Sequence, residues 1–147
     1  MVAGAWTVFW NAKKRMGLTG YQLDTGNFRM SLHKVGASAL LLSGNVSTYG
    51  SIGNTATGGG VSGDGQVLNS VSWTISGSAY VFDCSNETWS PTTSALTSVR
   101  YGVIRLSVGA TSGYPLCYAA LSTTAFTVGA DSTLTVQMAT TGIFTLT

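Results

Sequence analysis

The sequence predicts an all-β protein: a single-domain β-sandwich of the jelly-roll type, with a short arm or helix at its N-terminus. Three observations predict this fold. Apolar and polar residues alternate with a period of two in several short segments, which is typical of half-buried strands. Clusters of Gly, Ser, Asn and Asp separate these segments, as turns do in sandwiches. The chain has 147 residues, 44% of them apolar, which suits one domain with its own core.

Residues 1–20 are expected to form the arm, and residues 21–147 the sandwich. The arm contains the candidate partner-binding residues, which are large and apolar or basic: Trp6, Phe9, Trp10, Lys13, Lys14 and Arg15. The three aromatic residues and Lys13 fall at positions i, i+3, i+4 and i+7, a spacing that fits a short amphipathic helix. An exposed apolar arm that docks on a neighbouring molecule fits the same residues equally well.

The first strand is predicted within residues 21–35, where apolar side chains alternate with polar ones. His33 belongs to the polar set of this strand, so we expect its side chain to be solvated. Only residues 37–42 show a trace of helical periodicity after the arm. Residues 43–66 are rich in Gly, Ser, Thr and Asn and predict a long loop.

A hairpin is predicted in the middle of the chain, with strands at residues 66–75 and 80–84 and a turn at Gly77 and Ser78. Residues 99–108 carry apolar side chains on both faces, which predicts a central strand covered on two sides. A turn is predicted at residues 113–115. The remaining strands are predicted at residues 116–121, 126–128, 134–138 and 143–146.

The sequence lacks the residue patterns of a metal or cofactor site. It has one histidine, two cysteines and no CxxC pair, so no structural zinc and no cofactor are expected. Cys84 and Cys117 are each flanked by apolar residues and are expected to be small buried hydrophobes. A disulfide between them would need an oxidising compartment, and the sequence leaves that alternative open.

Catalytic patterns are also missing, and the protein is not expected to be an enzyme. Asp83 and Glu87 are close in sequence, but both flank a predicted turn and are expected to form turn hydrogen bonds. His33 has no nucleophile elbow to serve. The glycine spacing of residues 58–63 lacks the strand, helix and acidic residue of a dinucleotide site. The aromatic residues of the middle segments fit a stacking platform or, better, a packed core: Trp73, Tyr80, Phe82, Trp89 and Tyr101.

The chain is poor in charge. Charged residues make up 8% of it, and the net charge of +2 is too small to imply a nucleic-acid partner. No stretch approaches the ~20 consecutive apolar residues of a membrane span, so none is expected. Its polar surface must consist mainly of hydroxyl and amide groups, which cost less to desolvate than charges do. Such a surface suits a protein that is packed against a partner. It suits a secreted or viral β-protein with a neutral face equally.

Several segments, taken in order, resemble a family of tailed-bacteriophage virion proteins, many of them capsid decoration (cement) proteins. The arm pattern W-x-x-F-x-x-A-K is matched by Trp6, Phe9, Ala12 and Lys13. The further matching segments are LDTGNFRMSL, TATGGGVSGDGQVLNSVSW, YVFDCSNETW, SVRYGVIRL, GYPLCYAAL and the closing TTGIFTLT. They cover nearly the whole chain, and their order carries the resemblance. The low charge and the 43–66 loop depart from the family pattern.

The resemblance implies a structural role on the virion. The chain is then expected to bind the major capsid protein and to stabilise the head lattice as a homotrimer, on the capsid surface of a particle assembled in the host cytoplasm. Two alternatives stay open: a tail or fibre component of the virion, and a carbohydrate-binding β-sandwich module.

Overall fold

The computed structural model describes residues 3–18, 21–108 and 112–147, and antiparallel strands dominate it. The strands are β1 (Thr7–Val8), β2 (Phe28–Lys34), β3 (Gln66–Val67), β4 (Ser72–Ser76), β5 (Ala79–Asp83), β6 (Glu87–Trp89), β7 (Leu96–Ser107), β8 (Gly113–Ala120), β9 (Phe126–Val128), β10 (Leu134–Val136) and β11 (Phe144–Leu146). The helices are α1 (Trp10–Met16) and α2 (Ser38–Ser43), with 3₁₀ turns at Val35–Ala37 and Tyr49–Ser51. The predicted all-β, single-domain fold is confirmed.

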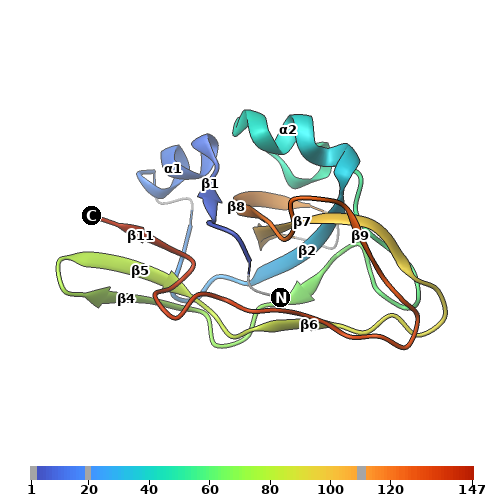
Figure 1. Ribbon diagram of the computed structural model, residues 1–147. Coiled ribbons are helices and arrows are strands. Elements are labelled where there is room, and N and C mark those ends of the chain that lie inside the picture. Colours follow the sequence, from blue (N-terminus) through green and yellow to red (C-terminus); the bar gives the residue numbers. More distant parts are fainter. Residues whose placement is uncertain (1–2, 19–20, 109–111) are drawn as a thin grey trace.

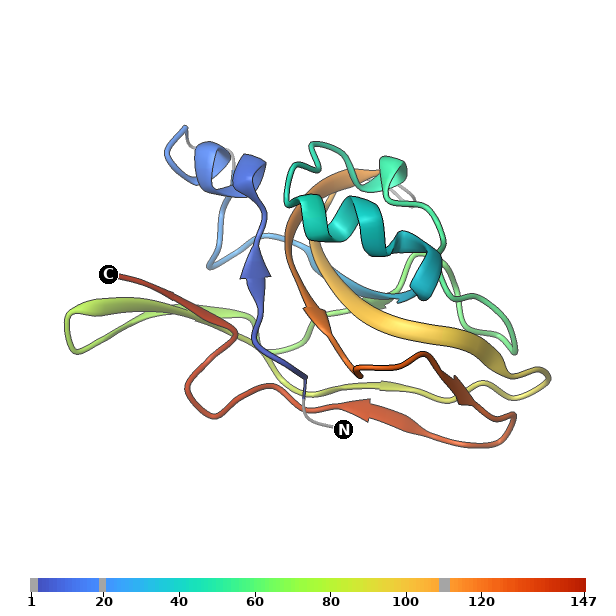
Figure 2. The ribbon, with the colours of Figure 1, turned by 45° about the horizontal axis from the view of Figure 1, so that its top comes forward.

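The strands form one large and two small sheets. The six-stranded sheet has the order β1-β8-β7-β2-β3, with β9 also paired to β7. The three-stranded sheet has the order β11-β5-β4, and β10 pairs with β6 in the third. Figures 1 and 2 show the small sheets along one side of the large sheet and the helices along the other. The core therefore lies mainly between the large sheet and the small ones.

Strand β7 is the centre of the large sheet, as its two apolar faces predict. It pairs with β2 on one side and with β8 on the other. Val99, Val103 and Ile104 are fully buried, although the adjacent Val103 and Ile104 point to opposite faces of the sheet. Only a strand covered on both sides can bury neighbours of opposite direction, such as Val103 and Ile104.

The hairpin is confirmed for β4 and β5, which pair around the turn at Gly77. Gly77 has a φ of +63°, a conformation that glycine adopts without steric cost. Strand β11 adds to the free side of β5. We call the sheet of β4, β5 and β11 the finger, because its hairpin projects beyond the large sheet in Figure 1.

Two predicted boundaries are wrong. The single strand predicted at residues 66–75 is divided: β3 pairs with β2 in the large sheet, whereas β4 belongs to the finger. The break lies at Ser70, whose φ is +52°. The turn predicted at residues 113–115 is instead part of β8, paired with Ser107, Leu106 and Arg105 of β7. The trace of helical periodicity at residues 37–42 corresponds to α2, which follows a 3₁₀ turn.

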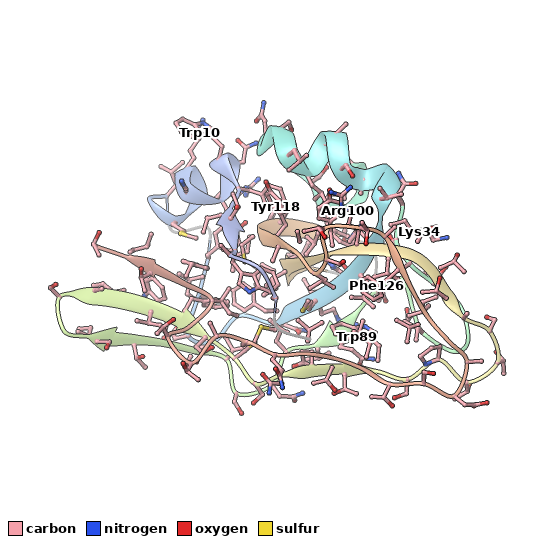
Figure 3. All side chains as sticks on the ribbon, in the orientation of Figure 1. Trp10, Lys34, Trp89, Arg100, Tyr118 and Phe126 are labelled. Carbon is pink, nitrogen blue, oxygen red and sulfur yellow. The ribbon has the colours of Figure 1, made fainter. Side chains whose placement is uncertain are left out.

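Large aromatic side chains hold the sheets together. Phe28 of the large sheet meets Phe82 of the finger edge to face, with ring centroids 5.2 Å apart. Trp89 of β6 is fully buried beneath the large sheet (Figure 3). Aromatic pairs in this geometry stabilise by about 1 kcal/mol beyond the apolar area that they bury. The predicted core role of Phe82, Trp89 and Tyr101 is confirmed, since each is at most 2% exposed.

The long loop of residues 43–66 is attached to the domain by the buried side chain of Arg105. Its guanidinium donates to the carbonyl oxygen of Asp64 at 3.1 Å and lies 3.7 Å from a carboxylate oxygen of the same residue. It also lies over the ring of Tyr49, 4.1 Å from the centroid. The buried guanidinium of Arg105 thus holds two separate parts of this loop, one at Tyr49 and one at Asp64. Few residues of the loop are apolar.

Candidate functional site

The N-terminal segment is an integral part of the domain. Strand β1 lies at the edge of the large sheet, where Thr7 pairs with Tyr118 and Val8 with Cys117. Helix α1 begins at Trp10, directly after Phe9, whose backbone is extended (φ −61°, ψ 145°). The helical spacing that begins at Trp6 in the sequence is therefore realised only from Trp10 onward, because Thr7 and Val8 form β1 and Phe9 is extended.

The six predicted partner-binding residues separate into buried and exposed groups. Phe9 is fully buried and packs on Tyr118, with ring centroids 5.1 Å apart. The assignment of Phe9 to a partner surface is therefore corrected: this side chain belongs to the core. Trp6 is half-buried, and Trp10 is 70% exposed and projects from α1 (Figure 3). Of the three aromatic residues, Trp10 offers the largest exposed surface.

The three cations lie in the last turn of α1, where the helix dipole favours positive charge. Lys13 and Lys14 are exposed and, together with Trp10, line a shallow depression of about 290 Å³. The guanidinium of Arg15 lies 3.7 Å from the ring centroid of Tyr114, so Arg15 contacts the domain itself. Trp10, Lys13 and Lys14 are the part of the predicted set that faces outward together.

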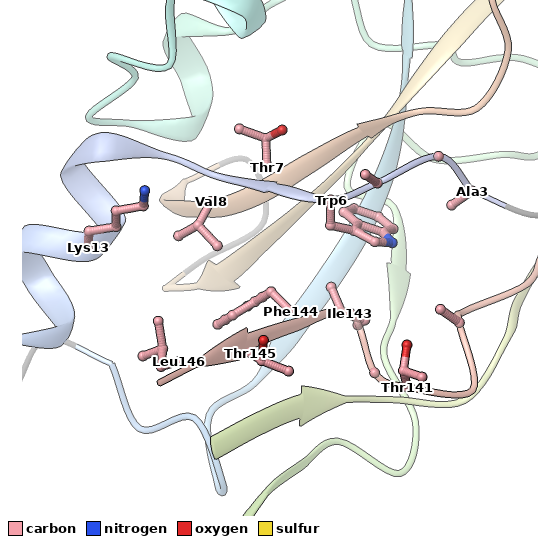
Figure 4. A pocket seen from close by; sticks show the side chains of 14 residues that line it. Ala3, Trp6, Thr7, Val8, Lys13, Thr141, Ile143, Phe144, Thr145 and Leu146 are labelled. Carbon is pink, nitrogen blue, oxygen red and sulfur yellow. The ribbon is translucent and has the colours of Figure 1, made fainter. Parts of the chain in front are cut away.

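A groove of about 680 Å³ runs between the N-terminal and C-terminal segments (Figure 4). Val8 of β1 and the preceding Trp6 line one side of it, and Ile143 and Phe144 line the opposite side. Lys13 is its one charged lining residue within the described part of the chain. In the sequence, the aromatic residues of the N-terminal segment indicated one wall of this groove. Nothing in the sequence indicated that the C-terminal segment forms the other wall.

The finger has one apolar face. The pairing of β4, β5 and β11 places six large apolar side chains on that face: Trp73, Ile75, Tyr80, Phe82, Phe144 and Leu146. Its inner half is packed, with the rings of Phe82 and Phe144 stacked 5.2 Å apart. Its outer half is open: Ile75 is 66% exposed and Tyr80 47%. Trp73 stacks on Tyr80 at 5.5 Å, so the predicted core role of these two aromatics holds only in part.

His33 is buried, and the expectation that it is solvated is wrong. Its Nδ1 donates to the carbonyl oxygen of Gly53 at 2.8 Å, so Nε2 is the acceptor for the hydroxyl of Ser31 at 3.0 Å. Burial lowers the pKa of His33 to about 4, and the positive charge of Arg105 acts in the same direction. Ser31 and His33 are at most 1% exposed, so this pair has no access to a substrate. The cause is the segment after α2, which covers this face of β2: Gly53 accepts from the imidazole, and the ring of Tyr49 lies edge to face with it, with centroids 5.8 Å apart.

The other chemically reactive groups of the described residues have local roles. Cys84 and Cys117 are free, buried thiols, as small buried hydrophobes are expected to be. Burial raises the pKa of Cys84 to about 12 and that of Cys117 well above its usual value. The local hydrogen bond predicted for Asp83 is present, since Asp83 accepts from the N–H of Cys84. The turn bond predicted for Glu87 is wrong: Glu87 lies in β6 and accepts from the N–H of Asn69, 18 residues away in the chain.

The described residues contain no group of three or more His, Cys, Asp or Glu side chains that could hold a metal ion. Helices long and apolar enough to cross a membrane are likewise not found among residues 3–18, 21–108 and 112–147.

The fold and its surfaces define an all-β protein whose open features are apolar faces and a groove. Neither family models, nor curated proteins, nor solved structures match this chain.

Proposed function

We propose that the chain is a structural protein of a phage virion, a decoration protein that docks onto the major capsid protein and stabilises the head lattice. The observation that carries this proposal is the open outer half of the finger face, where Ile75 and Tyr80 expose large apolar surface. Charged residues make up 8% of the chain, so little of the remaining surface consists of charged side chains. Both properties favour a protein that works while packed against other protein surfaces.

The proposed mechanism is burial of this surface at lattice junctions. Each fully buried large apolar side chain contributes about 1.5–3 kcal/mol, and neutral hydroxyl and amide groups add little desolvation cost. A trimer would make several such contacts around a local threefold axis. Once one subunit is bound, the other two bind at a high effective concentration, so the overall affinity exceeds that of a single subunit. The exposed cations Lys13 and Lys14 would assist encounter with an acidic capsid surface.

Binding to expanded capsids, purified from the phage that encodes the chain, tests the proposal. We expect saturable binding to the shells, visible by electron microscopy as density at lattice junctions. Density on the tail or fibres would instead assign the protein to that part of the virion. Binding to a glycan array, without binding to shells, would favour the carbohydrate-binding alternative and contradict the proposal.

A further inference from the structure

Strand β1 has a free hydrogen-bonding edge. Among the described residues it is the terminal strand of the large sheet and pairs with β8 alone. The N–H of Phe9 donates to the carbonyl oxygen of Leu116 at 3.0 Å, which identifies the residues whose backbone groups face β8. Backbone groups alternate in direction along an antiparallel strand, so Thr7 and Phe9 face β8. The N–H and C=O groups of Trp6 and Val8 therefore face away from it.

This edge borders the groove. Figure 4 shows the side chains of Trp6 and Val8 pointing from β1 toward β11, whereas Thr7 points away. The opposite wall ends in β11, which is also a terminal strand and pairs with β5 alone in the part of the chain that the structure describes. The groove is thus the open margin between two sheets, with apolar side chains inside and a strand edge along each rim.

The edge of β1 is short, with two residues in the strand, but the described residues show none of the other features that usually prevent strand pairing. Natural edge strands are blunted by Lys, Pro, bulges or a covering segment. Residues 3–12 contain neither a charge nor a proline, and small residues at Ala3, Gly4 and Ala5 let another backbone approach. Gly4 is itself exposed.

One buried donor at the groove lacks a partner. The indole Nε1 of Trp6 is covered and donates no hydrogen bond within the described residues. An unpaired buried donor costs about 1–3 kcal/mol. The indole would have to turn toward the groove before the carbonyl of a bound peptide could accept this hydrogen bond.

On the basis of the proposed function, we propose that the groove binds an extended segment of the capsid protein as an added strand along β1. Every second side chain of that segment would be apolar and would insert between Val8 on one wall and Ile143 and Phe144 on the other. The intervening residues would face solvent. An extended peptide is favoured over a small charged ligand because Lys13 is the one charged side chain of the lining. It is favoured over a helix because a helix has no free backbone groups to pair with an edge.

Hydrogen exchange, resolved to single amides, tests the added strand in the wild-type protein. In the free protein, the Phe9 amide is protected by β8, whereas the amides of Trp6 and Val8 exchange quickly. On expanded capsids we expect exchange at Trp6 and Val8 to slow at least tenfold. Protection that arises in concentrated protein without shells would show that a second copy occupies the groove, which would overturn the assignment to the capsid protein.

The substitution Val8→Pro provides the matched variant. It removes an N–H that the chain's own sheet does not use, so the melting temperature should change little. We expect it to weaken shell binding at least tenfold, and by more than Val8→Thr, which changes the side chain but keeps the N–H that an added strand would use. If Val8→Pro unfolds the domain, the exchange experiment on the wild-type protein decides whether a strand is added along β1.

The two proposals fail in different ways. Wild-type protein that binds shells with unprotected Trp6 and Val8 amides would overturn the added strand and leave the decoration role standing. Wild-type protein that does not bind shells at all would overturn the decoration role, and the assignment of the capsid protein to the groove with it.

Discussion

The hydroxyl oxygen of Ser31 lies 3.0 Å from Nε2 of His33 in the interior of the domain. The same imidazole donates from Nδ1 to Gly53, twenty residues along the chain. Each ring nitrogen therefore has one partner, and the pair joins β2 to the loop that follows α2. In an accessible cleft this geometry would indicate a nucleophile and its base. Buried as it is, it acts as a structural bridge that depends on a neutral imidazole.

The first prediction is a loss of stability in mild acid. The pKa of His33 is lowered to about 4 in the folded protein, against 6.5 in the unfolded chain. The unfolded state therefore binds more protons between these values, and stability falls as the pH is lowered from about 6.5 to 4. The full effect is roughly 3 kcal/mol, at about 1.4 kcal/mol per pKa unit. Urea denaturation at a series of pH values measures it.

A variant distinguishes the contribution of His33 to the pH dependence of stability from that of the carboxyl groups. His33→Asn removes the titration, so its stability should vary less between pH 6.5 and 4 than that of the wild type. Glu87 changes the stability in the opposite direction. Burial raises its pKa in the folded protein, so the folded state binds more protons than the unfolded chain, and the stability that this adds is lost as the pH rises above about 4.5. Glu87→Gln should therefore steepen the wild-type acid loss. An equal pH dependence of wild type and His33→Asn would contradict the assignment to His33.

The second prediction separates core from surface in the N-terminal segment. Phe9 is fully buried, so Phe9→Ala should lower the free energy of unfolding by about 3–5 kcal/mol. Trp10 is 70% exposed, so Trp10→Ala should change it by less than about 0.5 kcal/mol. If Trp10 is a contact on the particle, its truncation should weaken shell binding about thirtyfold, the effect of a 2 kcal/mol hot spot. Thermal unfolding and shell co-sedimentation measure both properties.

The third prediction compares two glycines with similar backbone angles. Gly65 has a φ of +71°, and a Cβ built on it would lie 2.1 Å from the carbonyl oxygen of Met30. Gly77 has a φ of +63°, and a Cβ there would meet no heavy atom within 4 Å. Gly77→Ala should therefore cost about 1 kcal/mol, the cost of the left-handed conformation alone. Gly65→Ala should cost about 3 kcal/mol, since β2 must also move. Equal denaturation midpoints for the two variants would contradict this.

The local patterns predicted the strands better than they predicted what covers them. The two apolar faces of residues 99–108 correctly indicated a central strand, because that property resides in the strand itself. The turn at Gly77 was predicted for the same reason. The strand at residues 66–75 was wrong because alternation continues across Ser70, whereas the chain there changes from one sheet to another. Alternation records which face a residue takes and carries no information about the sheet it joins.

The candidate site shows the same limit. The sequence indicated that the N-terminal segment is unusual, and Trp10 with Lys13 and Lys14 is exposed as expected. It did not indicate that Phe9 is core, because the aromatic ring of Tyr118 that covers it is 109 residues away in the chain. The groove also depends on the long-range meeting of the two chain ends. Ser31 and His33 appeared solvated for a related reason: their covering partners come from other segments.

The last prediction concerns the open face of the finger. Ile75 lies on its apolar face and is 66% exposed, while its neighbour Thr74 is exposed on the opposite face. Ile75→Glu places a charge where burial is proposed, and Thr74→Glu places the same charge on the same strand outside it. Both variants should keep the melting temperature of the wild type, because neither side chain is in the core. If the finger face packs against other subunits, Ile75→Glu should abolish self-association in light scattering and weaken shell binding at least tenfold, whereas Thr74→Glu should do neither. Equal behaviour of the two variants would show that this face is not an interface, since only their position relative to the face distinguishes them.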